Sequence, residues 1–448
     1  MRPGRLFASC ALAAIVAAGP MPRDAGAVAA IQSSVLPSGA TVVTRQRTGS
    51  QVLAIDLAVR AGARYEQKQT GSATRFLESA LLLGTEKWPS RDALTRAITS
   101  RGGELSVSAG REIVEVSVTV GISDVDLALD VLDQVLLHSR FDPEDLDRER
   151  SVILQQVQER EDEPEDRATD EFFQTMFAGH PLVNLPGGTS AGVEALTVEQ
   201  LRNYWQQRLV GPNVLISVVS GLPHEEVTAK LAGALQDLPR GPVLPLNYGD
   251  VPEAESRTVA LAVGSDQSHI FVGATVPGVA SEDRAPLRVL NAVLSKSSGR
   301  LFTEIRDKRG LAYSTYSALS QFVDGGVFMV YAGTRPDAAD AVLDLIMTEL
   351  QRVREEPLEA TELENAIEGD VGARILAVET SANEALYLAR DTMFGVPPRE
   401  IQAARIRAVT AADVQRVAQK YLNPDRLSVV ITRPSDDASV PSGVEVVP

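Results

Sequence analysis

The sequence is poor in residues that often build catalytic and crosslinked sites: of its 448 residues, one is cysteine, four are histidine and 5% are aromatic. A single cysteine, Cys10, cannot form an intrachain disulfide and leaves no set of thiolates for a zinc site. With so few aromatic residues, the cores must be built mainly from Leu, Val, Ile and Ala. No two histidines are near enough in sequence to suggest a chelating pair, and we expect a structural role for each of them: His138, His180, His224 and His269.

Basic residues are also few, with 43 Lys and Arg against 60 Asp and Glu and a net charge of −17. Nucleic acids and anionic membranes need cationic patches, so we expect neither as a partner. After the first thirty residues, no stretch approaches the ~18 continuous apolar residues of a membrane span. The sequence also contains no G-x-S-x-G nucleophile elbow and no phosphate-binding P-loop. A composition of 44% hydrophobic and 23% charged residues is that of a globular protein.

The first thirty residues have the three parts of a secretory signal. Arg2 and Arg5 precede an apolar stretch over 6–18, and small residues follow up to Ala30. An uncleaved anchor helix is the alternative, but about thirteen apolar residues are short of the ~20 that span a bilayer. We therefore expect a signal peptide over 1–30, cleaved from a soluble protein of the bacterial periplasm.

One supersecondary unit occurs twice in the sequence. Thr197 begins an amphipathic helix that is followed by a proline-containing turn and an apolar strand, and Thr410 begins the same arrangement about 213 residues later. Gln200 and Asp413 each stand three residues after the threonine, which is the spacing of a capping box. Solenoid repeats recur every 20 to 50 residues, so this long period indicates a duplicated domain.

The sequence therefore predicts two homologous α+β domains, over 31–237 and 257–448, joined by a proline-rich linker over 238–256. Within each half, alternating strands such as 114–120 are interspersed with helical patterns such as 124–137. We expect each domain to be a mostly antiparallel sheet covered by helices. The alternation of apolar and polar residues along 114–120 indicates that the other sheet face is solvated or lines a cavity.

Residues 71–85 resemble the zinc-binding helix of the pitrilysin/insulinase family of zinc peptidases, which includes mitochondrial processing peptidase. In that family the helix carries the inverted zinc motif H-x-x-E-H. Here Arg75 and Ser79 stand at the two histidine positions, and only the acid between them, Glu78, matches. Without a metal-bound water to deprotonate, Glu78 is expected to form a salt bridge with Arg75 or Arg150.

The family supplies a further glutamate ligand from a helix beginning R-E-R, which residues 148–156 resemble. The acid of this motif is Glu149, and the ligand position falls on Gln156. Zinc prefers neutral imidazole, thiolate or carboxylate ligands, whereas a guanidinium is a permanent cation and a hydroxyl is a weak donor. With three ligand positions lost, we expect no metal in this chain.

The most specific resemblance lies in the second half, where residues 294–314 are similar to the family's S-S-R-L-F-x-E-I-R-E-K-R-G-L-A-Y-S. The residues themselves predict a helix over 298–308, stopped by Gly310 as a left-handed cap and followed by a strand. Arg306 and Tyr313 would converge at this corner. On spacing alone, the arginine could instead pair with a neighbouring carboxylate. In the family, the corresponding pair reaches toward the peptide at the zinc site and can support a developing oxyanion.

The resemblance extends over nearly the whole chain after residue 30 and implies half of a hollow clamshell that encloses unfolded peptides. In paired bacterial members, one subunit carries zinc and its non-catalytic partner supplies the arginine and the tyrosine. We therefore expect a non-catalytic subunit without activity alone, with peptide substrates and a partner that has an intact HxxEH motif and holds the zinc. Two alternatives remain open: an inactive scaffold or peptide-binding protein, and a hydrolase with another metal arrangement that involves Glu78, Glu149 and Glu159.

Overall fold

The computed structural model describes the chain from Ala30 onward, with short gaps, over residues 30–67, 70–253, 255–295, 299–434 and 445–447. The predicted signal segment before Ala30, including Cys10, lies outside the described residues. Among the helices of the described chain, none is both long and apolar enough to cross a membrane.

The first half of the chain forms a six-stranded sheet in the order β1-β2-β6-β3-β5-β4. Strands β2 and β6 are parallel, and all other neighbours in this sheet are antiparallel. The strands are β1 (Gln32–Val35), β2 (Thr41–Gln46), β3 (Val52–Val59), β4 (Glu104–Ala109), β5 (Val114–Gly121) and β6 (Val214–Ser220).

The second half repeats this sheet in the order β12-β7-β11-β8-β10-β9. Five of its strands correspond to strands of the first sheet: β7, β11, β8, β10 and β9 take the places of β2, β6, β3, β5 and β4, and the parallel pair β7 and β11 stands in the corresponding place. The edge strands differ, because β12 is parallel to β7 whereas β1 is antiparallel to β2. This repetition confirms the predicted pair of homologous domains. The strands are β7 (Thr258–Val263), β8 (Ser268–Val276), β9 (Ala312–Gln321), β10 (Gly326–Thr334), β11 (Ser428–Pro434) and β12 (Glu445–Val447).

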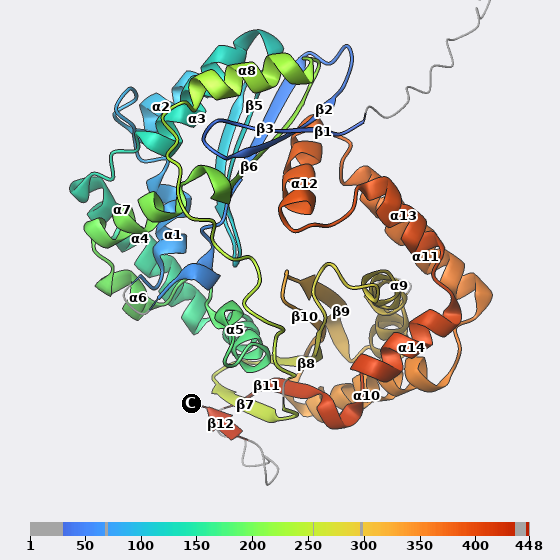
Figure 1. Ribbon diagram of the computed structural model, residues 1–448. Coiled ribbons are helices and arrows are strands. Elements are labelled where there is room, and N and C mark those ends of the chain that lie inside the picture. Colours follow the sequence, from blue (N-terminus) through green and yellow to red (C-terminus); the bar gives the residue numbers. More distant parts are fainter. Residues whose placement is uncertain (1–29, 68–69, 254, 296–298, 435–444, 448) are drawn as a thin grey trace, which may run out of the picture.

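Helices cover the outward face of each sheet, and their apolar sides form the two main cores with alternate residues of the strands (Figure 1). In the first domain they are α1 (Ala73–Ala80), α2 (Arg91–Thr99), α3 (Val125–Leu137), α4 (Pro143–Asp162), α6 (Ser190–Ala195), α7 (Val198–Arg208) and α8 (His224–Ala234). In the second domain they are α9 (Arg284–Ser295), α10 (Ala339–Glu355), α11 (Ala360–Leu376), α13 (Arg399–Arg407) and α14 (Ala411–Tyr421).

The predicted repeat unit is present in both domains. In α7 the hydroxyl of Thr197 accepts from the backbone N–H of Gln200, whose side chain accepts from Thr197 in return. In α14 the side chains of Thr410 and Asp413 make the same reciprocal pair. A short 3₁₀ turn then leads into β6 in one domain and β11 in the other. Both helices thus begin at the residues that the capping-box spacing predicts.

The two domains exchange one helix each. Helix α12 (Ser381–Met393) comes from the second half of the chain but packs on β3 and β6 of the first sheet, while α5 (Pro164–Met176) comes from the first half and packs on β8 and β11 of the second (Figure 1). Each helix buries apolar side chains against the inner face of its host sheet: Ala385, Leu388, Ala389 and Met393 from α12, and Ala168, Phe172 and Met176 from α5.

The expectation that the polar face of β5 is solvated or lines a cavity is therefore wrong in part. Glu115 on this face is buried, and both of its carboxylate oxygens accept hydrogen bonds from Arg390 of α12, at 2.7 and 2.5 Å. Burial raises the pKa of the adjacent Asp56 to about 7, and the charge of Glu115 adds to this effect. The neighbouring edge strand β4 keeps exposed polar side chains at Ser106 and Ser108.

A buried ionic cluster joins the two domains. The guanidinium of Arg64, from the first domain, donates to Glu112 and to Asp324 of the β9–β10 turn, and all three side chains are almost inaccessible to solvent. His180, which follows α5, lies with its Nε2 3.2 Å from the same Asp324 carboxylate. The backbone N–H of Tyr248, in the connection between the domains, also donates to Asp324 at 3.1 Å. The structural role expected for His180 is thus a contact that joins the two domains.

Candidate functional site

Helix α1, which carries the degenerate zinc motif, is held at its N-terminus by Glu66. One carboxylate oxygen accepts from the backbone N–H of Ser72 at 2.9 Å and the other from that of Thr74 at 2.7 Å. These donors have no partner within the helix, so the carboxylate caps them and complements the helix dipole. Burial raises the pKa of Glu66. Sequence reasoning missed this residue, because it stands outside the usual N-cap position.

Three of the degenerate positions meet between α1 and α4. Nη1 of Arg75 donates to Oε2 of Glu78 at 2.8 Å, and Nη2 of Arg75 donates to the side-chain oxygen of Gln156. The predicted salt bridge of Glu78 is thus formed with Arg75. Arg150 instead lies over the ring of Phe76, with its guanidinium carbon 5.1 Å from the ring centre. The structure therefore places an arginine between the acid and the amide where the family has zinc ligands.

The remaining positions have other partners. The hydroxyl of Ser79 donates to the carbonyl of Phe76 at 3.4 Å, within its own helix. Glu149 accepts from Arg91 of α2 at 2.9 Å, and Glu159 accepts from a glutamine one turn earlier at 2.8 Å. Over the part of the chain that the structure describes, no group of three or more His, Cys, Asp or Glu side chains could hold a metal ion. The structure therefore lends no support to a metal site built from Glu78, Glu149 and Glu159.

The site does not fit zinc chemically. The guanidinium of Arg75 cannot lose its proton in a protein, and it already donates to the two groups that could face a metal, Glu78 and Gln156. A serine hydroxyl and a carboxamide oxygen would complete the donor set, and neither is a ligand that zinc sites usually employ. Arg75, Ser79 and Gln156 therefore do not supply the ligand set that holds a zinc ion for activating a water or polarising a peptide carbonyl.

The segment that carries Arg306 differs from the predicted helix over 298–308. Its central part, η5 (Phe302–Asp307), is a π-helix, in which the backbone N–H of Lys308 donates to the carbonyl of Thr303 at 3.0 Å, five residues back. Gly310 has a φ of +62° and ends the segment in the left-handed conformation, as predicted. π-Helical turns are rare and are often found at functional sites.

A β-bulge displaces Tyr313 at the start of β9. Ala312 lies opposite Thr334 and Ser314 lies opposite Gly333, so Tyr313 is the extra residue without a partner on β10. Tyr313 is 79% exposed. The bulge and the π-helix together hold Arg306 and Tyr313 side by side at the rim of the second domain.

Arg306 and Tyr313 contact each other directly. Nη1 of Arg306 donates to the backbone carbonyl of Tyr313 at 2.9 Å, and the guanidinium carbon lies 5.0 Å from the centre of the tyrosine ring and 4.7 Å from that of Phe302. Within the described residues, the other guanidinium nitrogens of Arg306 and the phenol of Tyr313 have no hydrogen-bond partner. The corner thus presents free donors that suit a peptide carbonyl.

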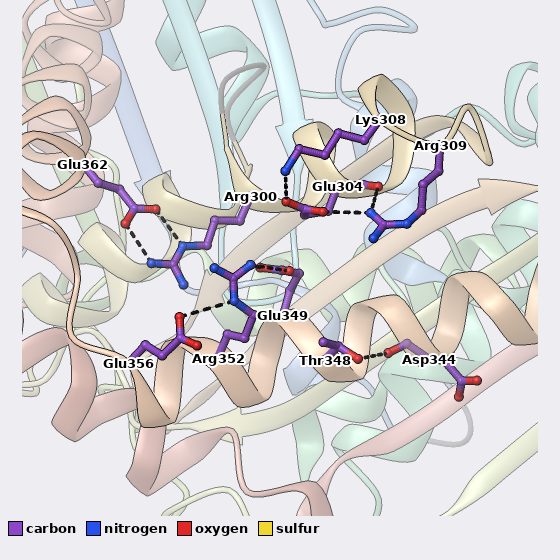
Figure 2. Close-up of polar contacts among 10 residues, drawn as sticks. All are labelled: Arg300, Glu304, Lys308, Arg309, Asp344, Thr348, Glu349, Arg352, Glu356 and Glu362. Atoms are coloured by element: carbon purple, nitrogen blue, oxygen red, sulfur yellow. Dashed lines mark hydrogen bonds and ion pairs between the residues drawn. The ribbon is translucent and has the colours of Figure 1, made fainter.

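An ionic network fixes the base of this corner to the outer helices (Figure 2). Nε and Nη2 of Arg300, six residues before Arg306, donate to the two carboxylate oxygens of Glu362 on α11 at 2.7 and 2.8 Å. Beside them on α10, Arg352 donates to the buried Glu349 at 2.9 Å. Glu304 forms ion pairs with Lys308 and Arg309, just after η5. Because Glu304 is paired with these two residues, Arg306 is available to contact Tyr313.

Comparisons with known proteins agree with this architecture. Residues 41–189 match the family model described as insulinase, peptidase family M16, and residues 195–369 match the model described as peptidase M16 inactive domain. An uncharacterized zinc protease of Streptomyces coelicolor is 31% identical over 406 residues, which are 88% of this chain and 88% of that protein. A probable mitochondrial-processing peptidase subunit beta of Arabidopsis thaliana is 26% identical over 421 residues, covering 90% of this chain and 78% of that protein.

Two solved structures share the fold. A crystal structure of a peptidase M16 inactive domain from Pseudomonas fluorescens has a TM-score of 0.85 at 21% identity and covers 92% of this chain and 100% of that chain. A protease from Helicobacter pylori has a TM-score of 0.86 at 20% identity, with coverages of 91% and 100%. The matched family models, the relatives and the repeated sheets lead to one conclusion: the chain belongs to the insulinase family of peptidases, family M16.

Proposed function

We propose that this chain is a non-catalytic subunit of a heterodimeric zinc peptidase of the periplasm, in which Arg306 and Tyr313 bind the peptide at the zinc site of a partner with an intact HxxEH motif. One contrast supports the proposal: Arg75 is a cation where the family has a zinc ligand, while the Arg306 and Tyr313 corner is intact and exposed. The signal-like pattern over 1–30 supports the location.

The corner suits the peptide that a partner would cleave. Arg306 has donors that remain free after it binds the carbonyl of Tyr313, and the phenol of Tyr313 projects into solvent. Both groups could donate to one carbonyl oxygen, and donors placed where charge develops contribute more to the transition state than to the ground state. This role needs no metal in the chain itself.

The test is to purify the tagged mature chain from periplasmic extract, identify a stoichiometric partner by mass spectrometry and measure peptide cleavage by the pair. Neither subunit alone should cleave the peptide. We expect Arg306→Ala to lower kcat/KM of the pair by roughly 100-fold and Tyr313→Phe by about 10-fold, as is typical for the loss of an oxyanion donor.

Arg309→Ala is the matched control, because Arg309 lies on the same segment but pairs with Glu304. It should leave kcat/KM within about threefold, in the range of an exposed ion pair. Unchanged turnover in the Arg306→Ala and Tyr313→Phe pairs would refute the assigned role. Recovery of the chain only with proteins that lack HxxEH would favour a scaffold instead.

A further inference from the structure

A cavity of about 970 Å³ lies between the two domains, and its lining contains neither the degenerate zinc positions nor Arg306 and Tyr313. One wall is the end of β2, residues 45–48, and the others belong to α11, α12 and α13. Ile375 and Leu376, in the last turn of α11, expose 62% and 69% of their surface here. The cavity thus combines an apolar surface with a charged lining, and its volume is in the range of ligand sites. The charged residues are five arginines and four acids: Arg45, Arg47, Arg374, Arg399, Arg407, Glu379, Glu384, Asp391 and Glu400.

The carboxylates on the first-domain side of the cavity are neutralised. Glu384 of α12 pairs with Arg45 at 3.0 Å and with Arg47 at 2.5 Å. Glu400 of α13 pairs with the same Arg45 at 3.1 Å. These four residues carry two charges of each sign, so they leave no surplus on this wall.

Arg374 on the opposite wall has no carboxylate partner. Its Nη2 donates to the neutral side chain of Gln402, and no carboxylate of the described chain lies within ion-pair distance of it. Asp391, which also lines the cavity, accepts a hydrogen bond from Gln402 at 2.9 Å and lies 3.7 Å from Arg399. Its negative charge is therefore already paired with Arg399. The helix dipole places about half a negative charge at the C-terminus of α11. This partial charge is already used, because Nη1 of Arg399 donates to the backbone carbonyl of Arg374 there.

The charged side chains around Arg374 include more arginines than acids. Arg288 is held by Asp370 at 2.6 Å, but Arg284, half-buried beside it, has no carboxylate within ion-pair distance among the described residues. Burial, together with the positive charge of Arg288, lowers the pKa of Arg374 to about 10, so the guanidinium stays charged at neutral pH. The charge of Asp370 opposes this shift only in part. A half-buried cation without a direct ion pair is costly, and an anion that enters the cavity would offset that cost.

We propose that this cavity binds a carboxylate that carries an apolar chain. The carboxylate is held by the guanidinium of Arg374, and the chain lies along Ile375 and Leu376. An arginine fork matches a carboxylate in two hydrogen bonds, whereas an amide offers it no charge. The C-terminal end of an apolar peptide and a medium-chain fatty acid both have this chemistry. The site is separate from the proposed peptide corner and does not depend on a catalytic partner.

Titration calorimetry of the mature chain with three probes tests the proposal. The probes are N-acetyl-tetraleucine with a free carboxylate, the same peptide as its C-terminal amide, and decanoate. We expect a carboxylate probe to bind and the amide to bind at least about tenfold more weakly, since it loses the charge-assisted pair. Binding of the peptide acid assigns the site to peptide C-termini, and binding of decanoate alone assigns it to acyl chains. Equal affinity for acid and amide, or no binding of any probe, overturns the proposal.

Arg374→Gln should abolish the preference for the acid, and Arg374→Lys should restore part of it. Because no carboxylate of the described residues forms an ion pair with Arg374, we expect Arg374→Gln to have a Tm equal to or above that of the wild type. Decanoate or the peptide acid should raise the Tm of the wild type but not of Arg374→Gln. Arg96→Gln, an exposed helix arginine paired with Asp92, is the control and should bind as the wild type does. An unchanged preference in Arg374→Gln would overturn the assignment of Arg374.

Discussion

A single side chain, Arg75, occupies the place between α1 and α4 where the resemblance to the family puts a zinc ligand. Its guanidinium pairs with Glu78 on α1 and donates to Gln156 on α4, so the bond to Gln156 links the two helices. The position of the helices therefore does not depend on metal, whereas in structural zinc sites the metal contributes to folding directly. The chain can therefore keep this fold without the zinc ligands of the family.

The same geometry predicts that zinc binding can be restored. Arg75 and Gln156 are already in contact across the two helices, and Ser79 lies one turn after Arg75 on α1. We expect a triple variant, Arg75→His with Ser79→His and Gln156→Glu, to retain zinc after dialysis, since it supplies two imidazoles and a carboxylate. Arg75→His alone should not. Metal analysis of both variants decides this, and a metal-free triple variant would show that the helices are wrongly spaced for coordination.

Residues near the site were predictable only where a motif or a spacing marks them. Arg75, Glu78 and Gln156 were identified through the resemblance, and the Arg75–Glu78 pair also follows from their spacing on one helix. The ion pair of Arg64 and Asp324 could not be predicted, because its two residues are 260 positions apart and the local sequence of neither indicates the other. Glu66 was missed for a similar reason, since it caps a helix from outside the usual position.

At the scale of elements, the corner of the second domain was predicted in outline and missed in detail. The left-handed stop at Gly310 follows from its residue type. The π-helical turn of η5 and the bulge at Tyr313 do not, because each inserts one residue into a regular pattern without a change in composition. These two irregularities bring Arg306 and Tyr313 together, so the least predictable local structure lies at the proposed site.

Arg300 is expected to fix η5 in place. Its fork to Glu362 is partly buried and bidentate, so Arg300→Ala should lower the free energy of unfolding by ~1–3 kcal/mol, as for charged hydrogen bonds. Hydrogen exchange of the backbone amides of 302–308 should quicken more than that of β10. Arg335→Ala removes a fully exposed pair with Asp337 and should change stability by less than about 0.5 kcal/mol. Exchange in η5 that equals the wild type would show that the fork does not hold this segment.

At the scale of the molecule, the ionic cluster between the domains makes stability depend on pH. Burial raises the pKa of Glu112 from its ordinary 4.5 to about 7, although Arg64 opposes the shift. Since the folded-state pKa lies above the unfolded one, the contribution of Glu112 is fully present below about pH 4.5 and is lost as the pH rises through about 7. Relative to Glu112→Gln, the wild type should therefore lose stability between these pH values.

Urea unfolding of both proteins at several pH values measures this difference. Asp56 and His180 also titrate differently in the folded state, but they are present in both proteins, so their effects cancel in the comparison. Above about pH 8 the difference should be constant. A difference that does not vary with pH would mean that folding does not raise the pKa of Glu112.

The exchange of α5 and α12 makes the two domains mutually dependent, although their duplicated sheets suggest independent units. Without α12, the first sheet would expose an apolar face that includes Val43, Ala58 and Leu215. We expect residues 31–257 and 258–448, produced separately, to aggregate or stay partly unfolded, and the two chains to copurify as a 1:1 complex when coexpressed. Leu388→Asp with Met393→Asp should prevent this complex, because it places two charges in the face of α12 that packs on the sheet. Size-exclusion chromatography distinguishes these outcomes, and two stable monomers that do not associate would show that helix exchange contributes little to the fold.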